Sequence, residues 1–259
     1  INYKYLDRYL VKTNIRADAH SSFGSNNRWG LFYGLFAGWR FTEEPFFEGL
    51  TWLNESLIRS SYGVSGRQPS DVYARFATYE STRIGSYINS PAIAPASVQL
   101  NNLRWETISS WNVGGEINLF DNRLYVEGDF YGKTSTDILF PFYQIPYSSG
   151  FDQLRFLNGG EMTNKGWELM ADFKAFSNKD WMLSFNLNLS HNSNSFSKLP
   201  ENFNTERSTS IGNGQYPLRV VEGEPIGSFF GFRYLGVYAS DEDVVAKDAD
   251  GNVLYDSEG

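Results

Sequence analysis

The 259-residue sequence contains no cysteine and only two histidines, His20 and His191. The lack of cysteine excludes disulfide bonds, thiol nucleophiles and Cys-ligated zinc within these residues. The two histidines lie far apart and outside the spacings of zinc-binding motifs, so each is expected to be a solvated or hydrogen-bonding side chain. We therefore predict no metal site and no cofactor.

Basic residues are also few, with 22 Lys and Arg against 30 Asp and Glu and a net charge of −8. This balance lacks the basic footprint that binds a phosphate backbone, and nucleic acid is not a predicted partner. No apolar run approaches the roughly 18–20 residues of a membrane-spanning helix, which excludes helical spans and only those. The sequence opens without Met or a signal peptide, and we expect both ends to be cut from a longer protein.

Alternation of apolar and polar side chains with period two recurs along the sequence, whereas helical periodicity is scarce. In 181–192, for example, Leu183, Phe185 and Leu187 alternate with small polar residues. The pattern predicts an all-β, antiparallel fold with seven strands and a candidate eighth at 227–238. The seven predicted strands are 5–18, 29–41, 55–64, 104–120, 122–139, 164–176 and 181–192.

Several of these ranges are about twice the ~5–6 residues typical of strands in soluble domains. A strand that crosses a membrane needs about 9–11 residues and can extend beyond the bilayer. The lengths therefore favour a transmembrane β-barrel. In such a barrel one row of each strand faces lipid and the other faces the interior.

The connections between the predicted strands alternate between tight turns, at 119–122 and 176–180, and long links rich in Gly, Pro, Ser, Tyr and Asn. If each strand crosses once, the tight turns share one end of the sheet and the long links share the other. Outer-membrane barrels have this plan, with periplasmic turns and extracellular loops. The predicted extracellular loops are 65–103, 139–163 and 193–226.

The link 42–54 falls at the tight-turn end. It is predicted to form one short helix that begins at Thr42, with Glu43 and Glu44 in its first turn.

The sequence also resembles the SusC/RagA-type TonB-dependent outer-membrane transporters of Bacteroidetes. The resemblance is spread over most of the chain, in the order that the family has. It is carried by "DRYL" (7–10), "NNRWG" (26–30), "AGWRFTEEPFF" (37–47), "SSYGVSG" (60–66), "RWET" (104–107), "LFDNRLYVEGDFYGKTSTDIL" (119–139), "SSGF" (148–151), "NGGEMTNKGWEL" (158–169) and "GEPIGSFFGFRYLGVY" (223–238).

The resemblance implies that residues 1–259 are part of a 22-stranded barrel, with the plug domain, the TonB box and the C-terminal strands lying outside them. It further implies a location in the outer membrane and active import of an oligosaccharide or peptide. The implied partners are TonB, a SusD-like surface lipoprotein, the solute and the lipid bilayer. TonB would act through a segment absent from these residues. The resemblance also places 223–238 in a large extracellular excursion, so that the candidate strand 227–238 would be part of a loop.

Aromatic side chains are frequent in the predicted loops, beside Asn, Gln and Arg. Such rings suit stacking on sugars or contact with a peptide backbone, although packing between loops or against a partner explains them equally well. The candidate solute-binding residues are Tyr73, Phe76, Tyr79, Tyr87, Phe142, Tyr143 and Tyr147.

Six acidic residues alternate with apolar residues on the predicted strands, and they form either an ordinary wet barrel wall or an acidic lining that contacts a solute. They are Glu106, Glu116, Glu127, Asp129, Glu168 and Asp172. No catalytic residue is predicted, since Glu43–Glu44 and 241–243 fit solvated acids better than an acid/base pair. "DADGN" (248–252) fits a turn better than a calcium site.

The sequence leaves two alternatives open. A secreted, soluble β-sandwich that binds glycans would have strands near six residues long in two facing sheets. A β-structured glycosidase would hold two carboxylates about 5–10 Å apart in a cleft.

Overall fold

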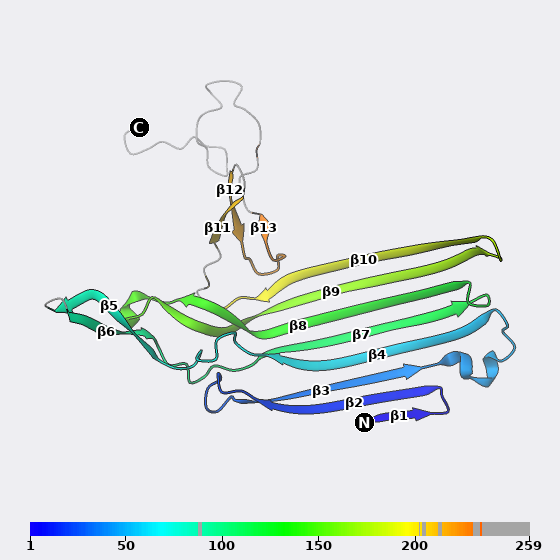
Figure 1. Ribbon diagram of the computed structural model, residues 1–259, viewed down its shortest axis with the longest axis horizontal. Helices are drawn as coiled ribbons and strands as arrows, with labels where there is room; N and C mark the ends of the chain where they lie inside the picture. The colour runs from blue at the N-terminus through cyan, green and yellow to red at the C-terminus, as the bar shows by residue number, and fades with distance from the viewer. Residues whose placement is uncertain (88–89, 202, 204–205, 212–213, 230–233, 235–259) are drawn as a thin grey trace, which may run out of the picture.

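The computed structural model consists mainly of antiparallel β-strands (Figure 1). It describes residues 1–87, 90–201, 203, 206–211, 214–229 and 234, and only the backbone of those that lie within 82–91 and 206–219. No helix within this described part is long and apolar enough to cross a membrane.

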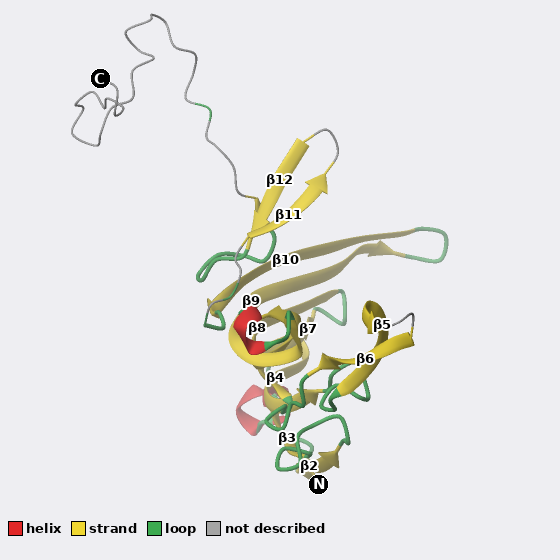
Figure 2. Cartoon of the chain, turned by 90° about the vertical axis from the view of Figure 1, so that its left-hand side faces the viewer, coloured by secondary structure: helices red, strands yellow, loops and turns green. Residues whose placement is uncertain are grey.

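Eight strands form the main sheet, in the order β1-β2-β3-β4-β7-β8-β9-β10, and every neighbouring pair is antiparallel. The strands are β1 (Asn2–Tyr5), β2 (Tyr9–Ala19), β3 (Trp29–Trp39), β4 (Leu53–Arg67), β7 (Glu106–Leu119), β8 (Leu124–Gln144), β9 (Gln153–Ser177) and β10 (Met182–Lys198). Figure 2 views the sheet along its strands, from β2 at the bottom to β10 at the top. The predicted all-β antiparallel fold is confirmed.

Two smaller sheets lie beside the main one (Figure 1). The first is a hairpin of β5 (Thr78–Tyr87) and β6 (Ser90–Ser97), within the link between β4 and β7. The second contains β11 (Glu206–Ile211), β12 (Gly214–Arg219) and β13 (Ser228–Phe229).

The eighth strand of the main sheet is β1, and not the predicted range 227–238. Leu6 and Asp7 have positive φ angles of 50° and 56°, which reverse the chain between β1 and β2 and break the single strand predicted over 5–18. Within 227–238, Ser228–Phe229 pair with β12 outside the main sheet, and most of the remainder lies outside the described residues.

The strands run further into the long links than the side-chain pattern indicates. β8 and β9 stay paired as far as Gln144 and Gln153, so 145–152 alone connects them, including the 3-10 turn η3 (Tyr147–Ser149). Likewise, β4 extends to Arg67 and β10 to Lys198. Backbone pairing continues there at most positions, even though the alternation has ended, and it is interrupted at Asp137 and Phe142, which both have positive φ angles.

The single helix predicted over 42–54 is wrong. The segment instead forms two 3-10 turns, η1 (Phe41–Glu43) and η2 (Pro45–Phe47), followed by β4 from Leu53. Glu44 precedes a proline, and the proline ring forces it into an extended conformation (φ −80°, ψ 141°) that stops a helix. Thr42 caps no helix, because its hydroxyl accepts a hydrogen bond from the Ser56 amide at 3.3 Å.

The main sheet has one apolar and one polar face. In one row across the sheet, Leu187 lies opposite Ala171, Ala171 opposite Val126, and Val126 opposite Ile117. Exposed apolar side chains cover the same face elsewhere, and they include Ile15, Leu31, Leu35, Val113, Phe130, Phe185 and Leu189. Since this face is both apolar and exposed, it suits contact with lipid.

Strand β3 carries a tryptophan at each end, Trp29 and Trp39, on the apolar face and exposed to 75% and 37%. Along this 11-residue strand they are ~33 Å apart, at about 3.3 Å per residue. At a barrel-strand tilt of roughly 40° this projects to ~25 Å along the membrane normal, the usual height of the apolar band. The two tryptophans therefore suit the two aromatic girdles of a membrane barrel.

Glu44 holds two aromatic side chains, Tyr9 and Trp39, at the tight-turn end of the sheet. Its buried carboxylate (7% exposed) accepts hydrogen bonds from the Tyr9 hydroxyl at 2.6 Å and from Trp39 Nε1 at 3.1 Å, and pairs with Arg8 at 3.2 Å. These contacts, the Tyr9 hydroxyl first, lower the pKa of Glu44 below its usual value.

Because this pKa is lowered in the folded state, Glu44 should stabilise the protein above the usual Glu pKa of about 4.3, with the gain lost as the pH falls through the folded-state value. We expect Glu44→Gln to melt at a lower temperature than wild type at pH 7, with the gap closing toward strongly acidic pH. Tryptophan fluorescence of the full-length protein in detergent measures this. The exposed neighbour Glu43, changed to Gln, should melt as wild type at both pH values, and an equal effect there would contradict the role of Glu44.

Candidate functional site

Three chain segments meet in a small apolar core at the end of the sheet that carries the long links. Phe23 follows β2, Ala74 and Leu103 lie on the link between β4 and β7, and Phe156 lies on β9. All four are buried, at 0–8% exposure, and Trp105 packs on Phe23 with ring centroids 4.4 Å apart. The links are therefore fastened to the extended β8–β9 hairpin.

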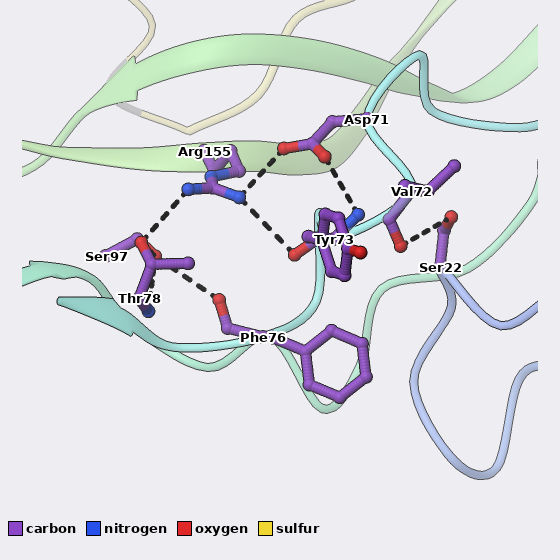
Figure 3. A network of polar contacts seen from close by, with 8 residues as sticks. All are labelled: Ser22, Asp71, Val72, Tyr73, Phe76, Thr78, Ser97 and Arg155. Carbon is purple, nitrogen blue, oxygen red and sulfur yellow. Dashed lines mark hydrogen bonds and ion pairs between the residues drawn. The ribbon is translucent and has the colours of Figure 1, made fainter.

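Arg155 of β9 fastens the same link through polar contacts (Figure 3). Its guanidinium pairs with the Asp71 carboxylate at 2.8 Å and donates hydrogen bonds to the Tyr73 carbonyl at 3.4 Å and the Thr78 hydroxyl at 3.0 Å. Thr78 in turn contacts the Ser97 hydroxyl at 2.8 Å. One side chain of β9 thus holds loop 71–78 at three points.

Hydrogen bonds from two other segments hold further backbone carbonyls of loop 71–78. The Ser22 hydroxyl donates to the Val72 carbonyl at 3.2 Å, and the Leu100 amide donates to the Arg75 carbonyl at 2.9 Å. A loop with its backbone groups paired in this way has few other conformations open to it.

The predicted aromatic residues fall into two groups at this end of the sheet. Tyr73, Phe76 and Tyr79 belong to loop 71–78 and the start of β5, and they are exposed to 64%, 39% and 69%. The rings of Tyr73 and Phe76 are 6.4 Å apart. Tyr87 ends β5, and its side chain lies outside the described part of the chain.

The second group lies at the tip of the β8–β9 hairpin. Phe142 and Tyr147 are exposed to 67% and 81%. Tyr143 is half-buried, because its hydroxyl donates a hydrogen bond to the Glu201 carbonyl and its ring packs on Phe203 with centroids 6.5 Å apart. The two groups together, without Tyr87, are called the outer aromatic surface below: Tyr73, Phe76, Tyr79, Phe142, Tyr143 and Tyr147.

The strand register places Arg155, which contacts the loop of the first group, beside Phe142 of the second group. Pro141 lies opposite Phe156, and Tyr143 lies opposite Leu154, so Phe142 and Arg155 occupy the intervening positions of β8 and β9. The residue that holds loop 71–78 is therefore on the strand next to Phe142. The structure brings six of the seven predicted aromatic residues to the same end of the sheet.

An open hollow of about 870 Å³ lies beside the second group. Its lining includes Tyr143, the Arg104–Asp137 ion pair (2.5 Å) and Asn158. The Asn158 amide holds the backbone of Arg104 on both sides, accepting from its N–H at 2.9 Å and donating to its carbonyl at 2.8 Å. The hollow thus presents both charge signs on a fixed backbone.

The acidic residues of the strands are used in different ways. Glu116, Glu127 and Asp129 of the polar face all pair with Arg59 of β4, at 3.3, 2.5 and 2.5 Å. Their position suits a charged barrel wall better than an acid/base pair, because one guanidinium pairs with all three carboxylates.

The other three acids do not join this cluster. Glu106 is buried and accepts a hydrogen bond from the Leu139 amide at 3.1 Å. Asp172 accepts a hydrogen bond from the Asn186 side chain. Glu168 is exposed on the polar face of the sheet, opposite Asp129.

Sequence reasoning missed Arg155, Asp71 and Arg59. Arg155 lies 84 residues from Asp71 and 77 from Thr78, so no local motif links them. The His20 ring accepts a hydrogen bond from the Ser22 amide at 3.2 Å, in keeping with the structural role expected for it. Within the described ranges, no group of three or more potential metal ligands comes together.

Comparisons with known proteins agree with this architecture. The family described as "TonB dependent receptor-like, beta-barrel" matches residues 1–257. TonB-dependent receptor P39 of Formosa agariphila is 33% identical over 93% of this chain, and TonB-dependent receptor SusC of Bacteroides thetaiotaomicron is 30% identical over 74%. The matched regions make up 22% and 20% of those two proteins.

Among solved structures, the RagAB peptide importer in the 'closed-closed' state superposes with a TM-score of 0.77 and 27% identity, covering 98% of this chain and 27% of that chain. The 'open-open' state gives a TM-score of 0.73 over 86% of this chain. The chain thus spans about a quarter of the length of the proteins it matches. The resemblance carried by the sequence motifs is confirmed, and the chain belongs to the TonB-dependent receptor-like β-barrel family, as part of a SusC/RagA-type barrel.

Proposed function

We propose that the protein to which this chain belongs is an outer-membrane transporter that imports an oligosaccharide or a peptide. TonB supplies the energy through a segment outside residues 1–259, and a SusD-like surface lipoprotein delivers the solute. The chain contributes barrel wall and external loops. Transport of this kind requires binding and passage and no covalent chemistry, so the protein acts without catalytic residues.

The observation that carries this proposal is the two-faced main sheet. A single layer of long strands with an exposed apolar face and a charged opposite face fits a barrel wall, with lipid on one side and a wet interior on the other. The family match and the likeness to SusC and to the RagAB peptide importer support the same reading. A soluble β-sandwich is disfavoured, because seven of the eight main strands have 11–25 residues and lie in one sheet.

The end that carries the β5–β6 hairpin faces the cell exterior in this proposal, and the end with the tight turns faces the periplasm. The loops in 65–103, 139–163 and 193–226 are then extracellular, and the outer aromatic surface contacts the solute. Rings held on a paired backbone suit this role, because little conformational entropy is lost when a ligand binds them.

Uptake by intact cells tests the function. Cells with and without the full-length gene would be supplied with a labelled tryptic digest of casein or a labelled hydrolysate of dextran. Uptake of either pool that requires both this gene and TonB supports the proposal. If the deletion strain takes up both pools as fast as the strain that carries the gene, import of these two solute classes is contradicted.

Tyr73 and Tyr79 are more exposed than Phe76, the third described ring of the first aromatic group. We expect Tyr73→Ala and Tyr79→Ala each to raise the half-saturation constant for uptake about five- to tenfold, at an unchanged amount of protein in the membrane, since a stacked ring contributes about 1 kcal/mol. The control Ile15→Ala removes an equally exposed side chain from the apolar face of β2 and should leave the constant unchanged. Wild-type constants in both tyrosine variants would remove the outer aromatic surface from the binding site.

A further inference from the structure

Arg155 is a charged residue that the proposed transport leaves without a role, although it is largely covered, with its side chain 24% exposed. We propose that Arg155 is a positioning residue for solute binding, which holds the tyrosine and phenylalanine rings of loop 71–78 in their outward arrangement. This inference rests on the proposed function, because it assumes that these rings contact the solute. Figure 3 shows the contacts that carry it.

The Arg155–Asp71 pair clamps the backbone of Tyr73 on both sides. Asp71 Oδ2 pairs with Arg155 at 2.8 Å, while Asp71 Oδ1 accepts a hydrogen bond from the Tyr73 amide at 2.8 Å. The Tyr73 carbonyl in turn lies 3.4 Å from Arg155 Nη1. Because both backbone groups of Tyr73 are held, the direction in which its ring leaves the loop is set by this ion pair.

A second branch of the network runs from Arg155 toward Phe76 and Tyr79. Arg155 Nη2 donates to the Thr78 hydroxyl at 3.0 Å, which contacts Ser97 at 2.8 Å. The Ser97 hydroxyl also lies 3.3 Å from the Phe76 carbonyl. Tyr79 is the residue that follows Thr78 along β5. The network thus contacts backbone groups of Tyr73 and Phe76 directly, and Tyr79 directly follows Thr78, whose amide and hydroxyl belong to it.

The chemistry of the contacts requires arginine at this position. One planar guanidinium donates in two directions at once, to Asp71 and Tyr73 through Nη1 and to Thr78 through Nη2. A lysine ammonium keeps the charge but lacks this fork, so it can retain the ion pair and lose the branch to Thr78. Positioning therefore depends on geometry as well as on charge.

The exposed rings need such a device. Val72, Tyr73 and Tyr79 are exposed to 54–69%, while Ala74 between them is fully buried in the small core. A free loop would relieve this exposure by folding its apolar groups inward, because burying them is favourable. The paired backbone prevents that collapse, so that the rings remain available to a ligand.

The test uses the full-length protein in the outer membrane and whichever of the two labelled pools wild type imports. Arg155→Gln should raise the half-saturation constant about tenfold, consistent with the loss of charge-assisted hydrogen bonds, while the maximal rate per assembled barrel stays unchanged. Arg155→Lys should show a smaller increase. Thr78→Val, which removes one contact of the network and leaves Arg155 in place, should also show a smaller increase.

Hydrogen exchange gives a second readout, in which the amides of 72–79 should exchange faster in Arg155→Gln than in wild type. Arg67→Gln is the matched control. It removes an exposed guanidinium (71%) at the same end of the sheet and should change neither quantity.

The possible results separate the two proposals. If Tyr73→Ala and Tyr79→Ala raise the half-saturation constant and Arg155→Gln does not, then Arg155 has no positioning role and the proposed function stands. If the tyrosine variants keep the wild-type half-saturation constant, the solute does not bind at these rings. The proposed role of Arg155 in positioning them is then also contradicted. Should Arg155→Gln lower only the amount of assembled protein, with the constants of both Arg155→Lys and Thr78→Val at the wild-type value, the residue serves folding alone and the inference is overturned.

Discussion

Replacing Arg59 by alanine should strongly reduce the amount of full-length protein that assembles in the outer membrane. Arg59 is the shared partner of Glu116, Glu127 and Asp129, and its side chain is only 21% exposed. Without it, three carboxylates remain close together on one part of the polar face. Removal of a partner from a fully buried charge pair costs about 3–5 kcal/mol, and solvent screening at this partly open site reduces the expected cost to ~2–3 kcal/mol.

The strand register explains why this position is sensitive. Glu116 on β7 lies directly opposite Glu127 on β8, and like charges in such a pair repel each other. Arg59 and Asp129 flank Gly114 in the next row, where a side chain at Gly114 would overlap the Asp129 carboxylate. Arg59 of β4 therefore compensates charges that two other strands, β7 and β8, bring together.

Assembly is measured by heat-modifiable migration of the outer-membrane fraction. Arg67→Ala is the control, because Arg67 lies on the same strand and is 71% exposed. The double variant Arg59→Ala with Glu127→Gln should recover part of the assembled protein, since it removes one of the uncompensated charges. Equal assembly of Arg59→Ala and Arg67→Ala would show that the cluster contributes little to folding.

Leu187→Arg should impair assembly at least as severely. Leu187 lies near the middle of the apolar row of β10, opposite Ala171. A charged side chain at the bilayer midplane of an outer-membrane barrel costs about 2–4 kcal/mol. We therefore expect a large loss of heat-modifiable, membrane-inserted protein.

Asn188→Arg is the matched control, because it places the same side chain one residue further along the same strand. Asn188 belongs to the polar row, where its side-chain amide donates to Asn186 at 2.5 Å. This variant should assemble at close to the wild-type level. Equal tolerance of the two arginines in the same assay would contradict the assignment of the two faces.

The main sheet was predictable because apolar and polar side chains alternate along its long strands. Trp39, Leu187 and Val113, for instance, can be assigned to the apolar face from alternation alone, since the side-chain period of a strand is two. Alternation in itself does not distinguish a barrel wall from other half-buried sheets, and strand length with the sorting of tight turns and long links made that distinction. The family resemblance added the size of the barrel and its expected partners.

The turns were harder to predict, because their geometry depends on backbone angles that the side chains signal weakly. Leu6 adopts a positive φ although leucine rarely does, so the break between β1 and β2 carries no glycine or asparagine signal. At 42–54 the signal was present in Pro45, whose effect on the preceding Glu44 outweighs the apparent helix start at Thr42.

The polar networks could not be predicted at all from local patterns. Arg59 meets partners 57–70 residues away, and Arg155 meets partners 77–84 residues away. Such contacts follow from strand register, which sets which side chains face each other. The aromatic candidates could be named because loop rings stand out in composition, whereas the residues that hold them do not.

The orientation of the two faces is tested most directly by spin labels placed singly along β10 of the full-length protein in lipid vesicles. Residues 1–259 contain no cysteine, so a single cysteine introduced at 185, 186, 187, 188 or 189 gives one defined labelling site within this range. The accessibility of the label to oxygen, which partitions into lipid, and to a water-soluble nickel chelate should then alternate. Labels at 185, 187 and 189 should favour oxygen and those at 186 and 188 should not. The reverse phase, or no alternation, would contradict a lipid-facing apolar row.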